Sequence, residues 1–164
     1  MASASRKTVL ITGCSEGGLG FALAKAFADA GYHVFASARN PSKAASLTGG
    51  SPHIELLQLD VTSAESIAAC AANVHERTSK AGRRGLDVLV NNAGVGLIMP
   101  LLDTPIQEGR KLYEVNVWGM LAVTQAFAPL LLEAKGVVLN ISSIAGAVRM
   151  AWQGSLHFQL HDRT

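Results

Sequence analysis

The sequence is poor in charged and aromatic residues. Of its 164 residues, 16% are charged and 5% are aromatic, and the formal net charge is only +2. There is also no run of basic residues. So weak a charge gives no reason to expect binding to nucleic acid or to an acidic membrane surface. We therefore expect no nucleic-acid partner.

Cysteine and long apolar runs are scarce as well. Cys14 and Cys70, the two cysteines, lack the spacing of a metal site or a redox pair. We therefore expect no bound metal and a reduced location, namely the cytoplasm. The most apolar stretch, residues 121–132, is too short to cross a bilayer and is interrupted by polar residues. It predicts a core helix and no membrane span.

What is present is an alternation of two patterns in a chain with 49% hydrophobic residues. Short apolar runs predict strands, and segments with a 3.6-residue period predict helices. The expected strands are 8–11, 32–38, 54–59, 86–90 and 137–141. The expected helices are 19–30, 63–80 and 105–133, with a short one starting at Pro41.

This alternation predicts an α/β fold with a doubly wound parallel sheet, the Rossmann fold, in the strand order 3-2-1-4-5. The pattern ends after Gly146. We therefore expect a nucleotide-binding domain over residues 1–146 and an irregular tail over 147–164. The sheet would then be incomplete at its C-terminal edge, where strand 137–141 has no further neighbour.

A glycine-rich segment follows the first strand. Gly13 permits a tight exit from the strand, Gly18 lets the backbone approach a diphosphate, and Gly20 lets the next helix pack closely. The helix N-terminus presents N–H groups to phosphates, and Ser15 and Leu19 of the same loop are candidate contacts. A purely structural glycine turn is the alternative, but the strand before and the helix after favour a dinucleotide site.

The second strand ends without the carboxylate that commonly holds a ribose 2′-hydroxyl. The position twenty residues after Gly18 is Ala38, and Arg39 follows it. A guanidinium can bind a 2′-phosphate through two hydrogen bonds, so this pair favours NADP(H) over NAD(H). A solvated surface arginine is the alternative.

Five motifs in this order carry a family resemblance. They are Thr12-Gly13…Gly18-Leu19-Gly20, Asp60-Val61, Asn91-Asn92-Ala93-Gly94, Asn116-Val117-Trp118-Gly119 and Asn140-Ile141-Ser142-Ser143. Together they resemble the short-chain dehydrogenase/reductase family over residues 7 to about 154, in a truncated form. The glycine loop has one residue more than the usual TGxxxGxG. In this it resembles a branch of fungal 1-acyl-dihydroxyacetone-phosphate reductases and reductases of secondary metabolism.

The resemblance implies cofactor contacts at the matching positions. Asp60 would accept a hydrogen bond from the adenine amino group, and Val61 would offer its backbone N–H. A helix-capping aspartate is an alternative reading of Asp60. The motif Asn91, Asn92, Ala93 and Gly94 would line the cofactor ribose and steady the central strand.

It also implies residues for the chemistry. Ser143, or Ser142 beside it, would hydrogen-bond the substrate oxygen, although serines can simply end a strand. Asn116 would anchor a water that passes protons. Its helical stripe, with Leu112, Gly119, Met120 and Val123, predicts a buried amide that needs partners, so a purely structural asparagine is the alternative.

The resemblance ends where the family has its tyrosine and lysine acid–base pair. The corresponding positions hold Leu156 and Leu160, neither of which can exchange a proton. We expect an NADP(H)-dependent oxidoreductase that interconverts a small-molecule carbonyl and alcohol, with a homo-oligomer as a further expectation from the family. The alternatives are a catalytically inactive cofactor-binding module and a non-functional truncated product.

Overall fold

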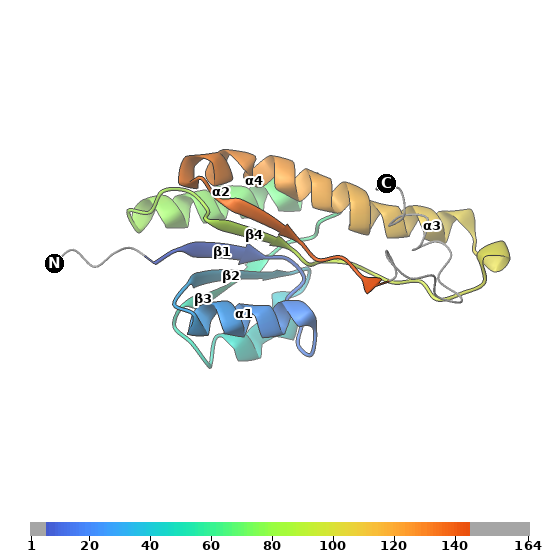
Figure 1. Ribbon diagram of the computed structural model, residues 1–164, viewed down its shortest axis with the longest axis horizontal. Coiled ribbons are helices and arrows are strands. Elements are labelled where there is room, and N and C mark those ends of the chain that lie inside the picture. The colour runs from blue at the N-terminus through green and yellow to red at the C-terminus, as the bar shows by residue number, and fades with distance from the viewer. Residues whose placement is uncertain (1–5, 145–164) are drawn as a thin grey trace.

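Five parallel strands form the centre of the computed structural model, which describes residues 6–144 (Figure 1). The strand order is β3-β2-β1-β4-β5, as predicted. The bounds are β1 Thr8–Ile11, β2 His33–Ala38, β3 Ile54–Gln58, β4 Val88–Asn91 and β5 Val137–Asn140. Each differs from its expected strand by two residues or fewer at either end. The predicted tail, 147–164, lies outside the described residues.

Helices cover both faces of this sheet (Figure 1). α1 (Leu19–Asp29) and the 3₁₀ helix η1 (Pro41–Leu47) pack on one face, and α2 (Ala64–Lys80) and α4 (Met120–Ala134) pack on the other. A short 3₁₀ turn, η2 (Leu101–Asp103), precedes α3 (Ile106–Tyr113). Because the sheet is covered on both sides here, β1 is buried along its whole length, which explains why three apolar residues in a row follow Thr8.

The long helix predicted for 105–133 has the expected extent, but it contains a π-helical segment, η3 (Glu114–Gly119), between α3 and α4. Leu112, Gly119 and Val123 are buried as predicted, whereas Asn116 and Met120 are only half-buried. The expectation of a buried Asn116 is therefore wrong. A π turn holds more residues than an α turn, so the 3.6-residue stripe does not continue through it.

The same helical stretch bears on the expected absence of a membrane span. By length and composition, the helical stretch Ile106–Ala134 could cross a membrane. The expectation of no membrane span considered residues 121–132 alone and so underestimated the length of this helix. Core helices pass the same test. The buried side chains of Val123, Phe127 and Leu130 pack into the cluster that covers the sheet. Leu121 and Leu132 are exposed, so the predicted core helix is buried on one face only.

The edge strand β5 is open to solvent. Among the residues that the structure describes, it pairs only with β4. Its apolar side chains are exposed, with Val137 at 54% and Leu139 at 45%. Within residues 6–144 this edge is therefore open, as predicted, and an open edge of a sheet can bind another strand.

Candidate cofactor-binding site

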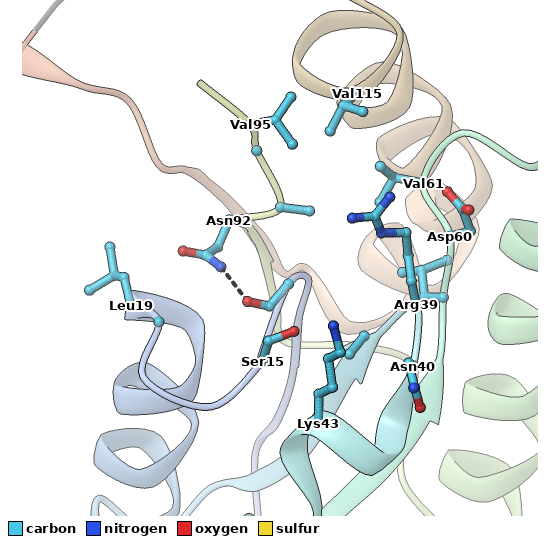
Figure 2. Close-up of a pocket in the computed structure, with 16 residues that line it drawn as sticks. Ser15, Leu19, Arg39, Asn40, Lys43, Asp60, Val61, Asn92, Val95 and Val115 are labelled. Atoms are coloured by element: carbon cyan, nitrogen blue, oxygen red, sulfur yellow. Dashed lines mark hydrogen bonds between the residues drawn. The ribbon is translucent and has the colours of Figure 1, made fainter. Parts of the chain in front are cut away.

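A cavity of about 690 Å³ lies beyond the carboxyl ends of β1, β2 and β4 (Figure 2). The adjacent strands β1 and β4 connect onward to helices on opposite sides of the sheet at this point, which is where open α/β sheets bind ligands. Most of the predicted cofactor residues line it. They are Gly13, Ser15, Gly18, Leu19, Arg39, Asp60, Val61, Asn92, Ala93 and Gly94.

Two glycines shape the loop between β1 and α1. Gly13 has a φ of +75°, and a Cβ there would lie 2.9 Å from the Cα of Ala93. A Cβ on Gly20 would lie 2.6 Å from the carbonyl oxygen of Gly13 and 2.5 Å from Nδ2 of Asn92. Gly20 does not line the cavity. It is buried, and because it has no side chain, the first turn of α1 can pack closely on Gly13 and Asn92.

The N-terminus of α1 faces this cavity through Gly18 and Leu19. No side chain caps the helix, and its first turn contains no acidic residue. The positive end of the helix dipole is therefore not offset by a neighbouring carboxylate within the helix. Such an end suits an anion such as a diphosphate.

Thr12 ties the loop after β1 to the loop after β4. Its hydroxyl accepts hydrogen bonds from the backbone N–H of Asn92 (3.0 Å) and of Ala93 (2.9 Å). In return, Nδ2 of Asn92 donates to the carbonyl oxygens of Thr12 (2.7 Å) and Gly13 (3.1 Å). Sequence reasoning quoted Thr12 within a motif but gave it no role. The sequence feature that could have indicated this role is a hydroxyl residue directly after a buried strand.

Two cations stand on the β2 side of the cavity. Arg39 directly follows β2, as predicted, and Lys43 lies on η1; both are exposed and line the cavity (Figure 2). Within residues 6–144, neither side chain forms an ion pair. Sequence reasoning missed Lys43, although a lysine four residues after Arg39 was visible.

Asp60 and Val61 line the cavity opposite the glycine loop. Oδ1 of Asp60 accepts hydrogen bonds from N–H (2.9 Å) and Oγ1 (2.7 Å) of Thr62, and these bonds hold the pKa of the Asp60 carboxyl below its usual value. The cap of α2 is Ser63, whose Oγ accepts a hydrogen bond from the N–H of Ser66 at 3.2 Å. Asp60 therefore orders the turn before α2 and does not cap the helix.

Asn91 points away from the cavity. Its side chain is buried, and Nδ2 donates to Oγ1 of Thr124 (3.0 Å) and to Oδ1 of Asn140 (2.9 Å). It therefore joins β4 to α4 and β5, which agrees with the expected steadying of the central strand. The structure does not bring it to the cavity with Asn92.

The residues predicted for chemistry lie at the border of the cavity. Asn116 makes two hydrogen bonds of 2.8 Å with the backbone of Val95, a lining residue: Nδ2 donates to its carbonyl oxygen, and Oδ1 accepts from its N–H. Ser142 and Ser143 follow the carboxyl end of β5 and are exposed. They do not line the cavity, so the structure does not bring them together with the cofactor residues.

Neither tyrosine of the chain reaches this cavity. Tyr32 packs edge-on against Phe27 with ring centroids 5.1 Å apart, and Tyr113 ends α3. The thiol of Cys14 is in the glycine loop, but burial raises its pKa to about 12, so it is no nucleophile at neutral pH. Among the described residues, no group of three or more His, Cys, Asp or Glu could hold a metal ion.

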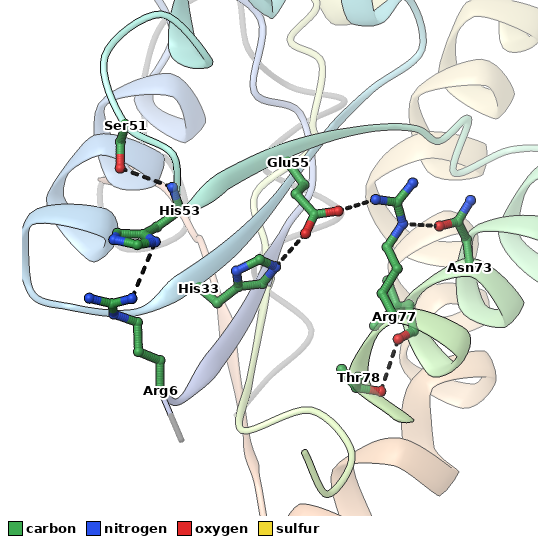
Figure 3. A network of polar contacts seen from close by, with 9 residues as sticks. Arg6, His33, Ser51, His53, Glu55, Asn73, Arg77 and Thr78 are labelled. Carbon is green, nitrogen blue, oxygen red and sulfur yellow. Dashed lines mark hydrogen bonds and ion pairs between the residues drawn. The ribbon is translucent and has the colours of Figure 1, made fainter. Parts of the chain in front are cut away.

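A separate polar network lies around the start of β2 and β3 (Figure 3). Oε1 of Glu55 pairs with Nε2 of His33 at 2.8 Å, and the other oxygen pairs with Arg77. Burial, followed by the charge of Arg83, lowers the pKa of His33 even though Glu55 acts to raise it. None of these residues lines the cavity.

Known proteins resemble this chain in sequence and in fold. A family model described as short chain dehydrogenase matches residues 7–155. The chain is 53% identical over 148 residues to a short-chain dehydrogenase of Talaromyces islandicus, covering 90% of this chain and 50% of that protein. It is 36% identical over 151 residues to the NADPH-dependent 1-acyldihydroxyacetone phosphate reductase of Schizosaccharomyces pombe, covering 92% and 49%.

A solved structure shares the fold. The alcohol dehydrogenase of the archaeon Thermococcus sibiricus, complexed with 5-hydroxy-NADP, is 29% identical with a TM-score of 0.84, covering 96% of this chain and 66% of that one. The chain spans about half the length of the two fungal relatives. The predicted likeness to fungal reductases, including one for acyldihydroxyacetone phosphate, is thereby confirmed.

Proposed function

The chain belongs to the short-chain dehydrogenase family, and from this we propose that it binds NADP(H) and serves the interconversion of a carbonyl and an alcohol on a small molecule. One observation carries the proposal. The cavity at the carboxyl ends of the strands joins an uncapped helix N-terminus to a rim with Arg39 and no carboxylate at position 38. This combination fits a dinucleotide with an additional phosphate.

Residues in the cavity wall would match the diphosphate, the 2′-phosphate, the adenine and the ribose of the cofactor. The N–H groups at the start of α1 would hold the diphosphate, and Arg39 the 2′-phosphate. Asp60 and Val61 would bind the adenine edge, and Asn92 with its neighbours the ribose. Bound NADP(H) supplies the hydride.

The reacting groups of the chain would act at the other end of the cofactor. Ser143, with Ser142 as the alternative, would hydrogen-bond the substrate oxygen. Asn116 would hold a water for proton transfer, next to its two bonds with Val95. The domain limits 1–146, a homo-oligomer and a cytoplasmic location are part of the same proposal.

A cofactor-binding module without activity is the second candidate. Two observations support this candidate. Both tyrosines lie away from the cavity, and leucines occupy positions 156 and 160, where the family has its tyrosine and lysine. Loss of a general acid typically lowers a rate by about 10²–10⁴. Under this candidate, binding persists while turnover is lost.

Titration of the purified chain with NADPH, followed by an assay of turnover on a panel of carbonyl compounds, tests both candidates. Binding with turnover supports the enzyme, and binding without turnover supports the module. Failure to bind NADPH refutes both.

A matched pair of variants shows whether binding uses the glycine loop. Gly13→Ala and Gly82→Ala both force an alanine into a positive φ, but only the Cβ at Gly13 meets a backbone atom within 3 Å, the Cα of Ala93. We expect Gly13→Ala to lose NADPH binding and Gly82→Ala to retain it. Equal binding by both variants would place the nucleotide elsewhere.

A further inference from the structure

We propose that Lys43 is the second cation of the 2′-phosphate site and helps the protein to discriminate NADP(H) from NAD(H). This inference rests on the proposed function, because it assigns a residue within the same cavity. Lys43 shares the cavity wall with Ser15 and Arg39 (Figure 2). Its side chain extends from η1 into the space between those two residues (Figure 2).

The backbone of Lys43 is fastened to the glycine loop. The N–H of Glu16 donates to the carbonyl oxygen of Lys43 at 2.8 Å, and Oε1 of Glu16 accepts from Oγ of Ser46 at 3.0 Å. The next residue, Gly17, has a φ of +78°. This is the segment in which the loop is one residue longer than TGxxxGxG. The longer loop thus reaches η1 and ties it to the phosphate-binding turn.

The start of η1 is fixed as well. Oδ1 of Asn40 accepts from the N–H of Ser42 (3.1 Å) and from its hydroxyl (2.7 Å), and Pro41 occupies the first turn. Lys43 therefore projects from a short helix that is held at both ends. Its ammonium can reach the cavity with little loss of backbone freedom on binding.

The charges on this rim match a phosphate monoester. Such a group carries a charge of about −1.5 to −2 at neutral pH. The nearby carboxylates have hydrogen-bond partners: Asp60 bonds Thr62, and Glu16 bonds Ser46. Arg39 and Lys43 together supply two positive charges, so a bound 2′-phosphate would be balanced by the pair and not by Arg39 alone.

Comparing the affinities for NADPH and NADH distinguishes a lysine that binds the 2′-phosphate from one that binds the diphosphate. NADPH and NADH share the diphosphate and differ at the 2′ position. A lysine on the 2′-phosphate affects NADPH alone, whereas a lysine on the diphosphate affects both. A lysine that is only solvated affects neither.

The experiment measures the Kd of NADPH and NADH for the full chain and three variants. We expect Lys43→Gln to weaken NADPH binding about tenfold and to leave NADH within about twofold, in line with the loss of one charged hydrogen bond. Lys43→Arg should restore most of the NADPH affinity. Lys7→Gln, which removes an exposed lysine just before β1, is the matched control and should change neither Kd.

Circular dichroism of each variant verifies the fold. Lys43→Arg keeps the positive charge, so it separates the effect of losing the charge from the effect of changing the side chain. Equal losses for both cofactors, or no loss for NADPH, would overturn the role of Lys43 while leaving the proposed function intact. A wild-type chain that binds neither cofactor would instead overturn the proposed function, and this inference with it.

Discussion

Gly20 offers the most direct test of how the glycine loop is built, through the substitution Gly20→Ala. The added methyl group would stand 2.6 Å from the carbonyl oxygen of Gly13 and 2.5 Å from Nδ2 of Asn92. The backbone oxygen cannot move unless the loop moves. Displacing the amide of Asn92 would break its bonds to the carbonyl oxygens of Thr12 and Gly13.

The expected cost follows from these contacts. Overpacking typically costs about 1–3 kcal/mol, and each lost hydrogen bond adds about 1 kcal/mol. Alanine returns up to about 1 kcal/mol through its better helix propensity. We therefore expect the free energy of unfolding to fall by about 2–4 kcal/mol and NADPH binding to weaken strongly, because the displaced loop forms the diphosphate site.

Urea unfolding measures the first effect, and fluorescence titration with NADPH measures the second. Gly109→Ala on α3 is the control, since a Cβ there meets no atom within 4 Å. It should keep or slightly raise stability and leave binding unchanged. If Gly20→Ala matches the control in both assays, the close approach of α1 to the loop is not what shapes the site.

Three further predictions concern parts of the fold outside the cofactor cavity. Asn91→Ala should lower stability by about 2 kcal/mol, as seen in urea unfolding, because the bonds to Thr124 and Asn140 are lost; an unchanged midpoint would show that these bonds contribute nothing. His33 has a lowered pKa, so the unfolded chain takes up its proton first, and stability should fall as the pH drops below about 6.5. His33→Gln should reduce that fall in pH-dependent melting, whereas identical curves would refute the assignment. Val137→Lys on the open edge of β5 should reduce self-association in size-exclusion chromatography without altering the melting temperature, and unchanged association would show that this edge is not the contact.

The sheet could be predicted from sequence because its strands are short apolar runs bounded by turns. β1 is buried on both faces, and after Thr8 its residues Val9–Ile11 are all apolar. The order of the strands then follows from right-handed crossovers. The carboxyl ends of the strands, and with them Gly13, Arg39 and Asp60, come to one cavity as a consequence.

The parts that sequence did not supply depend on where side chains point. Asn91 and Asn92 are neighbours, yet Asn91 ends β4 and bonds to α4 and β5, whereas Asn92 follows the strand and lines the cavity. The π turn around Asn116 has no signature in a 3.6-residue pattern. Lys43 lines the cavity from η1, which Glu16 ties to the glycine loop, and such a tertiary contact is not visible in the sequence.

Titration of the intact chain with NADPH, in parallel with Gly13→Ala, tests most directly whether the loop after β1 holds a dinucleotide. We expect saturable binding of one NADPH per chain, stronger than that of NADH and lost in the variant. Folded protein that shows no affinity for either nucleotide at millimolar concentration would contradict it.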